Sequence, residues 1–340
     1  MKKLYIISNE KIFCKDNNFY CDNIDLKSTP EELSKNFEVF LIGKKSKNEK
    51  LHKINIKNIY IFRSIFFYIN CIFRSFKDKD TRYLIISITP YTLLASLFLK
   101  IFNRSSKIYL RSDGFGEYRA ILGLIGPFIY QIMFTLSSIT SELISCRSFI
   151  LRGKKGDIIS PSQLDERWFQ NQKKPILGKR NLLYVGRIKV EKGIYSLVKI
   201  IENKKDISLS IVGAEKNGPK KINQNNVKVF DNENNKEELI KYYDDHNIFI
   251  LPSFTEGHPM VLLEALARLR PVIIFKDIAH VIGEKKGIFA IERNYEDLLK
   301  TINYIFANYE KIQLEMNNNK LPTKKNFIND LKNIINPKSD

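Results

Sequence analysis

Short apolar runs alternate with longer segments of helical pattern along most of the chain. Such runs, bounded by glycine, proline or polar residues, are typical of strands buried on both faces of a parallel sheet, and the longer segments of the helices that cover it. Thr29, Pro30 and Glu32 predict a capped helix start. The first half is therefore expected to be a doubly wound α/β domain, with strands at 4–8, 39–42, 83–88 and 107–110 and helices at 29–36 and 91–102.

The alternation stops between Gly153 and Lys179, where glycine, proline and lysine gather, and then resumes. The second half predicts strands at 182–185, 209–212, 227–230, 248–251 and 271–275, and helices near 193 and at 237–244, 259–268, 295–309 and 325–335. The predicted organisation is two α/β domains, residues 1–164 and 181–320, joined by a linker at 165–180. The helical end, residues 321–340, is expected to pack back on the first domain.

Two apolar segments of the first half stand apart from this pattern. Tyr60–Phe76 is rich in aromatic residues and contains Arg63 and Arg74, which predicts a helix able to lie among lipid headgroups. The alternative is a core helix of the first sheet. Residues 120–141 carry no charge, but glycine, proline and hydroxyl residues dilute their hydropathy. A buried or membrane-resting helix is expected there rather than a transmembrane span.

Composition narrows the classes of partner. Of 340 residues, 44% are hydrophobic and 27% charged, as in ordinary globular proteins. Lys and Arg outnumber Asp and Glu by 56 to 37, giving a net charge of +19. This excess indicates an acidic partner, such as nucleic acid, an anionic membrane or phosphate-bearing ligands. Nucleic acid is disfavoured because no stacking or basic-groove module is present. Four cysteines without metal-ligand spacing and a short N-terminal apolar run predict a cytoplasmic protein.

The first segment with candidate chemistry is 251–267, a strand end, a loop and a helix start. Helix-start amides at Met260 and Val261 would form an anion site next to Gly257, and His258 could contact the same ligand. Glu264 stands among apolar helix residues, so its carboxylate needs hydrogen-bond donors, which ligand hydroxyls would supply. The alternative for Glu264 is a position on a solvated stripe of the helix.

The second segment is the strand-to-helix turn 185–193. Arg187 and Lys192 flank this turn, and Gly186 and Gly193 permit close backbone approach. Arginine grips phosphate with two parallel hydrogen bonds and lysine adds a compact charge, so a diphosphate is the expected ligand. Taken alone, the segment could equally be an ordinary basic turn.

Together the two segments resemble the group 1 glycosyltransferases, also called family 4. Glu256 and Glu264 have the hallmark spacing of seven intervening residues, with Pro-Ser before the first, Gly-x-Pro after it and Glu-Ala-x-Ala at the second. The resemblance covers about residues 181–272. It implies the GT-B architecture, in which two Rossmann-like doubly wound domains face each other across a cleft, with the acceptor bound by the first domain and the nucleotide-sugar donor by the second.

The resemblance also implies roles for matching positions. Arg187 and Lys192 would hold the diphosphate, with Lys192 balancing charge on the leaving group. Glu264 would bind the ribose hydroxyls, and Glu256 would lie against the donor sugar at the reacting carbon. Amides from Gly257 to Val261 would contact sugar and phosphate. No metal or other cofactor is expected.

Some positions depart from the family pattern or match nothing in it. Arg268, Leu269 and Arg270 stand where a glycine is usual, and the loop 276–281 lacks the usual glycines. Asp113 follows a strand of the first domain, so it could assist acceptor deprotonation as a catalytic residue or could simply form an Asp-Gly turn. Asp78 and Asp80 have the spacing of a metal-binding pair but read as a solvated charge run.

The function expected from the sequence is transfer of a sugar, with retained configuration, from a nucleotide diphosphate sugar to a glycan or lipid-linked acceptor. Surface polysaccharide or glycolipid biosynthesis is the expected setting, with peripheral attachment to the cytoplasmic face of an anionic membrane. The alternatives are a non-catalytic nucleotide-sugar-binding protein on the same fold, or a phosphorylase or epimerase.

Overall fold

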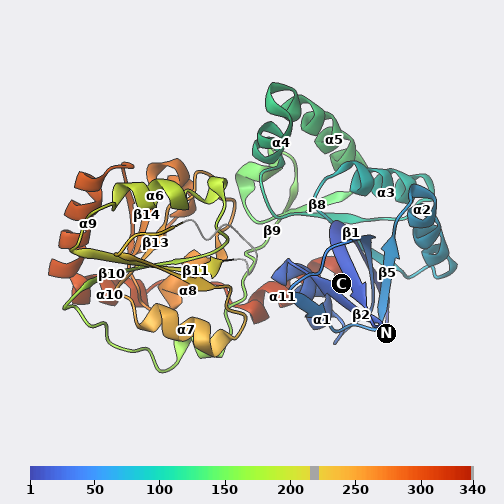
Figure 1. Cartoon of the computed structure of the whole chain (residues 1–340). Coiled ribbons are helices and arrows are strands. Elements are labelled where there is room, and N and C mark those ends of the chain that lie inside the picture. The colour runs from blue at the N-terminus through green and yellow to red at the C-terminus, as the bar shows by residue number, and fades with distance from the viewer. Residues whose placement is uncertain (215–221, 338–340) are drawn as a thin grey trace. The chain divides into compact units, whose positions relative to one another are not determined.

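The computed structural model describes residues 1–214 and 222–337, which divide into two compact units (Figure 1). The first unit runs from Met1 to Ser160 and also takes the C-terminal segment from Lys325. The second runs from Pro161 to Lys324.

The first unit is built on a mainly parallel sheet whose strands lie in the order β5-β3-β1-β6-β7-β8-β9. The strands are β1 (Lys3–Lys15), β3 (Glu38–Lys45), β5 (Asn58–Phe62), β6 (Arg82–Ile86), β7 (Lys107–Leu110), β8 (Glu142–Ser145) and β9 (Gly156–Ile158). Two short antiparallel strands are added to it: β2 (Asn18–Cys21) pairs with the C-terminal end of β1, and β4 (His52–Ile54) pairs with β2. The chain winds outward from β1 in one direction and from β6 in the other, so the unit is doubly wound.

Helices cover both faces of this sheet. One face packs against α2 (Ile65–Arg74), α3 (Pro90–Ile101) and α5 (Gly126–Thr140), which follows α4 (Gly114–Leu122). The other face packs against α1 (Ile24–Leu33) and the C-terminal helix α11 (Lys324–Ile335) through buried Leu26, Leu33, Phe327 and Leu331. Successive residues of β1 point to opposite faces, so Tyr5 and Ile7 enter one core while Leu4 and Ile6 enter the other.

The second unit repeats the doubly wound plan with a parallel sheet in the order β12-β11-β10-β13-β14-β15. Its strands are β10 (Arg180–Val185), β11 (Ile207–Ala214), β12 (Val227–Asp231), β13 (Ile248–Leu251), β14 (Val272–Phe275) and β15 (Ile288–Ile291). Its helices are α6 (Ile194–Ile200), α7 (Lys236–Asp244), α8 (Met260–Ala267), α9 (Tyr295–Ala307) and α10 (Tyr309–Asn317). The winding direction reverses between β10 and β13, which places a topological switch point at their carboxyl ends.

The segment 165–180, predicted to be a linker, instead packs onto the second unit. Trp168 is fully buried in that core. Arg268 donates to the carbonyls of Trp168 at 3.1 Å and Gln170 at 2.7 Å, and its guanidinium binds both carboxylate oxygens of Asp244 at 2.8–2.9 Å. Arg270 donates to the carbonyl of Lys173 at 2.9 Å. Two buried guanidiniums with complete sets of partners therefore fasten this segment, which explains why arginines follow α8.

Several predicted elements begin elsewhere in the structure. The helix predicted at 29–36 begins at Ile24, because the Asn23 side chain accepts from the amide of Asp25 and caps it there. Tyr60–Phe76 divides into the end of β5 and α2, whose start Ser64 caps. Residues 120–141 include a chain reversal at Gly123 rather than one helix. Pro259 is the N-cap of α8 and precedes its first turn.

Candidate functional site

The loops that follow β10 and β13 meet at the switch point of the second sheet. These two strands are neighbours in the sheet, although the loops are separated by about sixty residues of sequence. The amide of Phe254 donates to the carbonyl of Glu191 at 3.0 Å, which ties the loop after β13 to the turn after β10. The carboxyl ends of neighbouring strands at such a point are the usual ligand site of an open α/β sheet.

Gly193 makes this close approach possible. Its φ of 64° lies in the left-handed region, and a Cβ added there would lie 1.9 Å from the carbonyl oxygen of Pro252. The same oxygen accepts from Arg293 at 2.9 Å, and the Arg293 guanidinium stacks over the rings of Phe254 and Phe275 at 4.1 Å. Any other residue at 193 would push the two loops apart.

Lys192 and Glu256 form an ion pair at the meeting point of the loops. Lys192 Nζ lies 2.6 Å from Glu256 Oε1, and the side chains are 23% and 10% exposed. The buried Ser253 hydroxyl donates to the same oxygen at 2.7 Å. A charged pair that is mostly withdrawn from solvent interacts more strongly than a surface pair. A cation and an acceptor group are thus held side by side, and both side chains keep part of their surface exposed.

Two histidines hold the backbone of the loop after β13. His280 lies in the short helix after β14 (Lys276–Val281), and its Nε2 donates to the carbonyl of Glu256 at 2.7 Å. His258 Nε2 donates to the carbonyl of Pro161 at 2.9 Å. The imidazole of His258 therefore holds two segments of the second unit together through this nitrogen, and Gly257 lies between Glu256, whose carbonyl His280 holds, and His258.

Gly186 and Arg187 form the opening of the turn after β10. Gly186 has a φ of 149°, which L-residues rarely adopt, and its amide donates to the carbonyl of Val212 at 2.9 Å. The Tyr184 hydroxyl donates to the carbonyl of Arg187 at 2.9 Å, which fixes the backbone while the Arg187 side chain stays exposed. The guanidinium is therefore available to a ligand at the edge of the site.

The start of α8 adds hydrogen-bond donors, because its Pro259 cap supplies no side-chain acceptor for the amides at Met260 and Val261. About one turn on, Glu264 Oε2 accepts from the Tyr243 hydroxyl at 2.8 Å. Burial raises the pKa of the Glu264 carboxyl to about 7, and the hydrogen bond from Tyr243 works in the opposite direction. A half-buried carboxylate with one protein donor has room for the hydroxyl donors of a ligand.

Comparison with known proteins identifies the domain that carries this site. Residues 166–321 match the family model for glycosyl transferases group 1. They form a group 1 glycosyltransferase domain. An uncharacterized glycosyltransferase of Haemophilus influenzae is 30% identical over 149 residues, which are 39% of this chain and 41% of that protein. The matched stretch thus spans about two fifths of the relative's length.

Solved structures extend the likeness to both units. WaaG, a glycosyltransferase involved in lipopolysaccharide biosynthesis, has a TM-score of 0.66 at 14% identity, with 98% of this chain and 100% of that chain covered. Anabaena HepE, solved with UDP and glucose, has a TM-score of 0.68 at 13% identity, with 99% and 100% covered. These likenesses establish the fold as GT-B, built from two Rossmann-like domains.

The glycosyltransferase domain brings together residues that the sequence proposed and others that it did not. Gly186, Arg187, Lys192, Glu256, Gly257, His258, Met260, Val261 and Glu264 all lie on the turn after β10, the loop after β13 or α8. Tyr243, His280 and Arg293 complete the site but matched no motif. Only their three-dimensional contacts reveal them, because they lie on elements outside the two segments that carry the motifs.

Asp113, predicted as a catalytic candidate, belongs to the first unit and has structural partners there. Its side chain accepts from the amide of Phe115 at 3.3 Å as the N-cap of α4, and it pairs with Arg152 at 3.4 Å. These contacts fit the turn-forming alternative, and the catalytic role of Asp113 stays a prediction.

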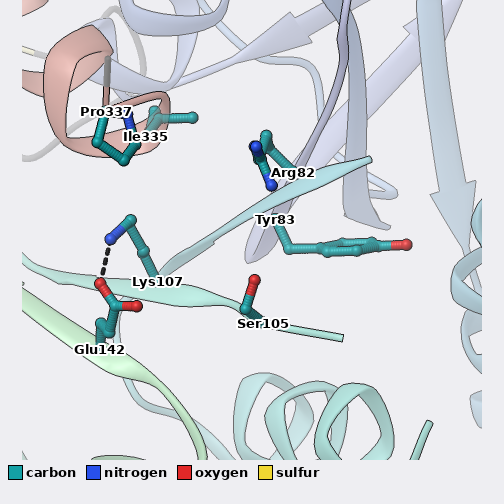
Figure 2. Close-up of a pocket in the computed structure, with 7 residues that line it drawn as sticks. All are labelled: Arg82, Tyr83, Ser105, Lys107, Glu142, Ile335 and Pro337. Atoms are coloured by element: carbon teal, nitrogen blue, oxygen red, sulfur yellow. Dashed lines mark hydrogen bonds and ion pairs between the residues drawn. The ribbon is translucent and has the colours of Figure 1, made fainter. Parts of the chain in front are cut away.

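The first unit contains a small hollow of about 130 Å³ (Figure 2). Arg82, Lys107 and Glu142 line it, and each is the first residue of its strand. Lys107 and Glu142 pair with each other, and Ile335 and Pro337 close one side. The hollow thus lies at the amino edge of the sheet, opposite the edge where such sheets bind ligands.

Proposed function

We propose that this protein transfers a sugar, with retention of configuration, from a nucleotide diphosphate sugar to a glycan or lipid-linked saccharide acceptor. The observation that carries the proposal is the Lys192–Glu256 ion pair at the switch point. Glu256 lies in the loop that leads into α8, whose first amides have no side-chain cap, and Glu264 lies on α8 about one turn from its start. A cation, an acceptor group and a half-buried carboxylate suit the phosphate, sugar and ribose of one extended donor.

Each part of the donor has a matching group on the protein. The diphosphate would take Lys192, the exposed Arg187 and the free amides at Met260 and Val261. The ribose hydroxyls would donate to Glu264, which has one protein donor already. The sugar would contact Glu256 and the backbone around Gly257.

The bond that breaks joins the anomeric carbon to the diphosphate oxygen, and its electron pair goes to the departing diphosphate. The acceptor hydroxyl oxygen forms the new bond to the same carbon, and its proton passes to an oxygen of the departing diphosphate. Negative charge therefore grows on the diphosphate during the reaction, next to Lys192 and Arg187. Fixed positive charge aimed at that position lowers the barrier because it needs no reorganisation. A role for Asp113 as base is not part of the proposal, since α4 and Arg152 already use its carboxylate.

A panel of nucleotide diphosphate sugars tests the reaction class. We expect release of nucleoside diphosphate from at least one donor, slowly with water and faster with an acceptor mixture. Glu256→Gln should keep nucleotide binding and lose most of the release. Binding of nucleotide sugars without release from any of them would favour the non-catalytic alternative.

Turnover is expected to persist in excess EDTA. Lys192, Arg187 and the α8 amides supply the positive charge that a divalent metal would otherwise bring to the diphosphate. Initial rates measured before and after chelation test this. Complete loss of activity, restored by added manganese, would overturn the metal-free proposal.

The setting proposed is surface polysaccharide or glycolipid biosynthesis at the cytoplasmic face of a membrane. The name of WaaG places that structural relative in lipopolysaccharide biosynthesis. Within the first unit, Lys and Arg outnumber Asp and Glu by 29 to 16. Such an excess favours peripheral attachment to anionic lipid, by about 1 kcal/mol for each basic residue near the surface.

A further inference from the structure

The first unit carries a helical hairpin, α4–α5, formed by residues 113–140. Gly123 (φ 64°, ψ −141°) ends α4, a short 3₁₀ turn at Gly123–Ile125 follows, and α5 begins at Gly126. A Cβ added to Gly126 would lie 2.0 Å from the carbonyl oxygen of Tyr118, so the two backbones touch. Residues eight apart in one continuous helix would be separated by about 12 Å. The chain therefore reverses, and Figure 1 shows α4 and α5 joined at one end.

The base of the hairpin is fixed to the first unit. Phe115 packs edge-on against Tyr130, with ring centroids 4.8 Å apart, and contacts Phe134 at 5.9 Å. Tyr130 and Phe134 are buried in the core on the α3 face of the sheet. Arg152 stacks over Phe115 at 4.7 Å. These ring contacts fix the base of the hairpin, so the hairpin keeps one orientation relative to the sheet of the first unit.

The tip of the hairpin, residues 121–128, is apolar and exposed. Leu124 is 90% exposed, Ile121 72%, Phe128 68% and Ile125 65%. No residue from 120 to 141 is charged, and Ile132, Leu136 and Ile139 continue the exposed apolar surface along α5. Soluble monomers rarely leave so many large apolar side chains together in water, which marks an interaction surface.

The hairpin is unsuited to crossing a bilayer. By length and composition alone, the 27 residues Gly114–Thr140 could cross, since their most apolar 18-residue window has a mean hydropathy of 1.7 and is only 28% buried. The reversal at Gly123 leaves α5 as the longer arm, and its 15 residues extend about 22 Å, against the ~30 Å hydrocarbon core. The inner face of α5 is also committed to the core of the first unit.

We infer that the tip of the α4–α5 hairpin inserts into one leaflet of an anionic bilayer. Arg119 is exposed in the last turn of α4, one turn before the tip, at the height where lipid phosphates would lie if the tip reached the acyl chains. From Arg119 to Leu122, where α4 ends, the helical rise is about 4.5 Å, and the side chains of the tip extend this reach toward the depth of about 5–10 Å reached by interfacial helices. The basic excess of the first unit complements an anionic lipid surface.

Insertion would also place the membrane near the edge of the sheet that is suited to the acceptor. The hairpin starts at Asp113, directly after the carboxyl end of β7, and carboxyl ends form the ligand-binding edge of such a sheet. The inference deepens the proposed function and rests on its membrane attachment. A lipid-linked acceptor held in the leaflet would need only a short reach to that edge.

A tryptophan placed at the tip tests the insertion directly. Leu124→Trp is compared with Leu314→Trp, which replaces a leucine of α10 in the second unit that is also exposed, at 68%. The chain's own Trp168 is buried and gives both variants the same background. With vesicles of equal phosphatidylglycerol and phosphatidylcholine, we expect a blue shift and quenching by chain-brominated lipid for Leu124→Trp alone.

A paired serine variant measures the energetic contribution. Leu124→Ser combined with Ile125→Ser should lower partitioning onto anionic vesicles roughly tenfold or more, while Leu314→Ser leaves it unchanged. All replaced side chains are exposed, so thermal unfolding should stay the same. The inference would be overturned if the double serine variant co-sedimented with vesicles as well as the wild type does. It would also be overturned if brominated lipid did not quench the tryptophan at the tip.

Two further outcomes have separate meanings. Wild-type protein that stays in the supernatant would remove membrane attachment and the insertion with it, while donor turnover measured without lipid tests the reaction independently. A dimer seen by light scattering, and abolished by the serine variant, would identify a second copy as the occupant of the tip and would overturn lipid insertion.

Discussion

Lys192→Ala is expected to reduce turnover roughly a hundred- to a thousandfold, the usual effect of removing one preorganised group that stabilises developing charge. Lys192 Nζ is fixed 2.6 Å from Glu256 Oε1, at the point where the leaving diphosphate would gain charge. Because that charge grows only as the bond breaks, the loss should fall mainly on kcat, with a smaller change in donor affinity. Measuring kcat and the nucleotide Kd on the same preparations separates the two effects.

Lys189→Ala is the matched control, since Lys189 lies on the same turn and is exposed. It removes the same charge from the turn without removing a partner of Glu256, so its kcat should stay near that of the wild type. A kcat that falls equally in both variants would mean that general charge on the turn, rather than the placed ammonium, supports the reaction. An unchanged kcat in Lys192→Ala would reject the leaving-group role.

Glu264→Gln is expected to stabilise the ligand-free protein above pH 7. The folded state raises the pKa of this carboxyl to about 7 from an ordinary 4.5, so folding disfavours its ionised form. Stability is therefore greatest while the group is protonated in both states, and falls as pH rises from about 4.5 to about 7. The full penalty is present above that range, and we expect glutamine to relieve about 2–3 kcal/mol of it.

Denaturant unfolding at pH 5 and pH 8 measures this difference. The gain for Glu264→Gln should be small at pH 5 and largest at pH 8. Glu202→Gln, which replaces an exposed carboxylate of the second unit, should change stability little at either pH. A gain in stability of the same size at pH 5 and pH 8 would mean that packing, not ionisation, causes the difference between the variant and the wild type.

The same carboxylate should contribute to nucleotide binding. If ribose hydroxyls donate to Glu264, Glu264→Ala should weaken nucleotide binding by about 1.5–3 kcal/mol, because one partner of the lost hydrogen bonds is charged. Wild-type affinity should also rise between pH 6 and pH 8 as the carboxyl ionises, and this rise should vanish in Glu264→Gln. Calorimetry that shows unchanged affinity in the folded alanine variant would exclude the ribose role.

The sequence determined the two α/β domains and most of the candidate site residues. Apolar strands such as Ile248–Leu251 need burial on both faces, and this requirement is written in consecutive side chains. The spacing of Glu256 and Glu264 likewise describes one loop and the helix that follows it. Such information is local, so it can be read without knowing what the segment packs against.

The tertiary structure decided which local alternatives were realised. An apolar run without clear periodicity does not distinguish helix from strand, and Tyr60–Phe76 is predicted from sequence as one helix. In the structure its first residues belong to β5, which pairs with β3. Residues 120–141 were one apolar segment in sequence, and contact between Gly126 and Tyr118 makes them part of a hairpin. The predicted linker is instead fastened by buried Arg268, whose acceptors lie about a hundred residues earlier.

The site itself shows the same division. Lys192 and Glu256 are 64 residues apart and meet only because β10 and β13 are neighbours in the sheet. Tyr243 reaches Glu264 from another helix and, with burial, sets the ionisation of its carboxyl. Sequence therefore specified which groups are present, whereas their pairing and ionisation depend on distance and burial, which exist only once the chain has folded.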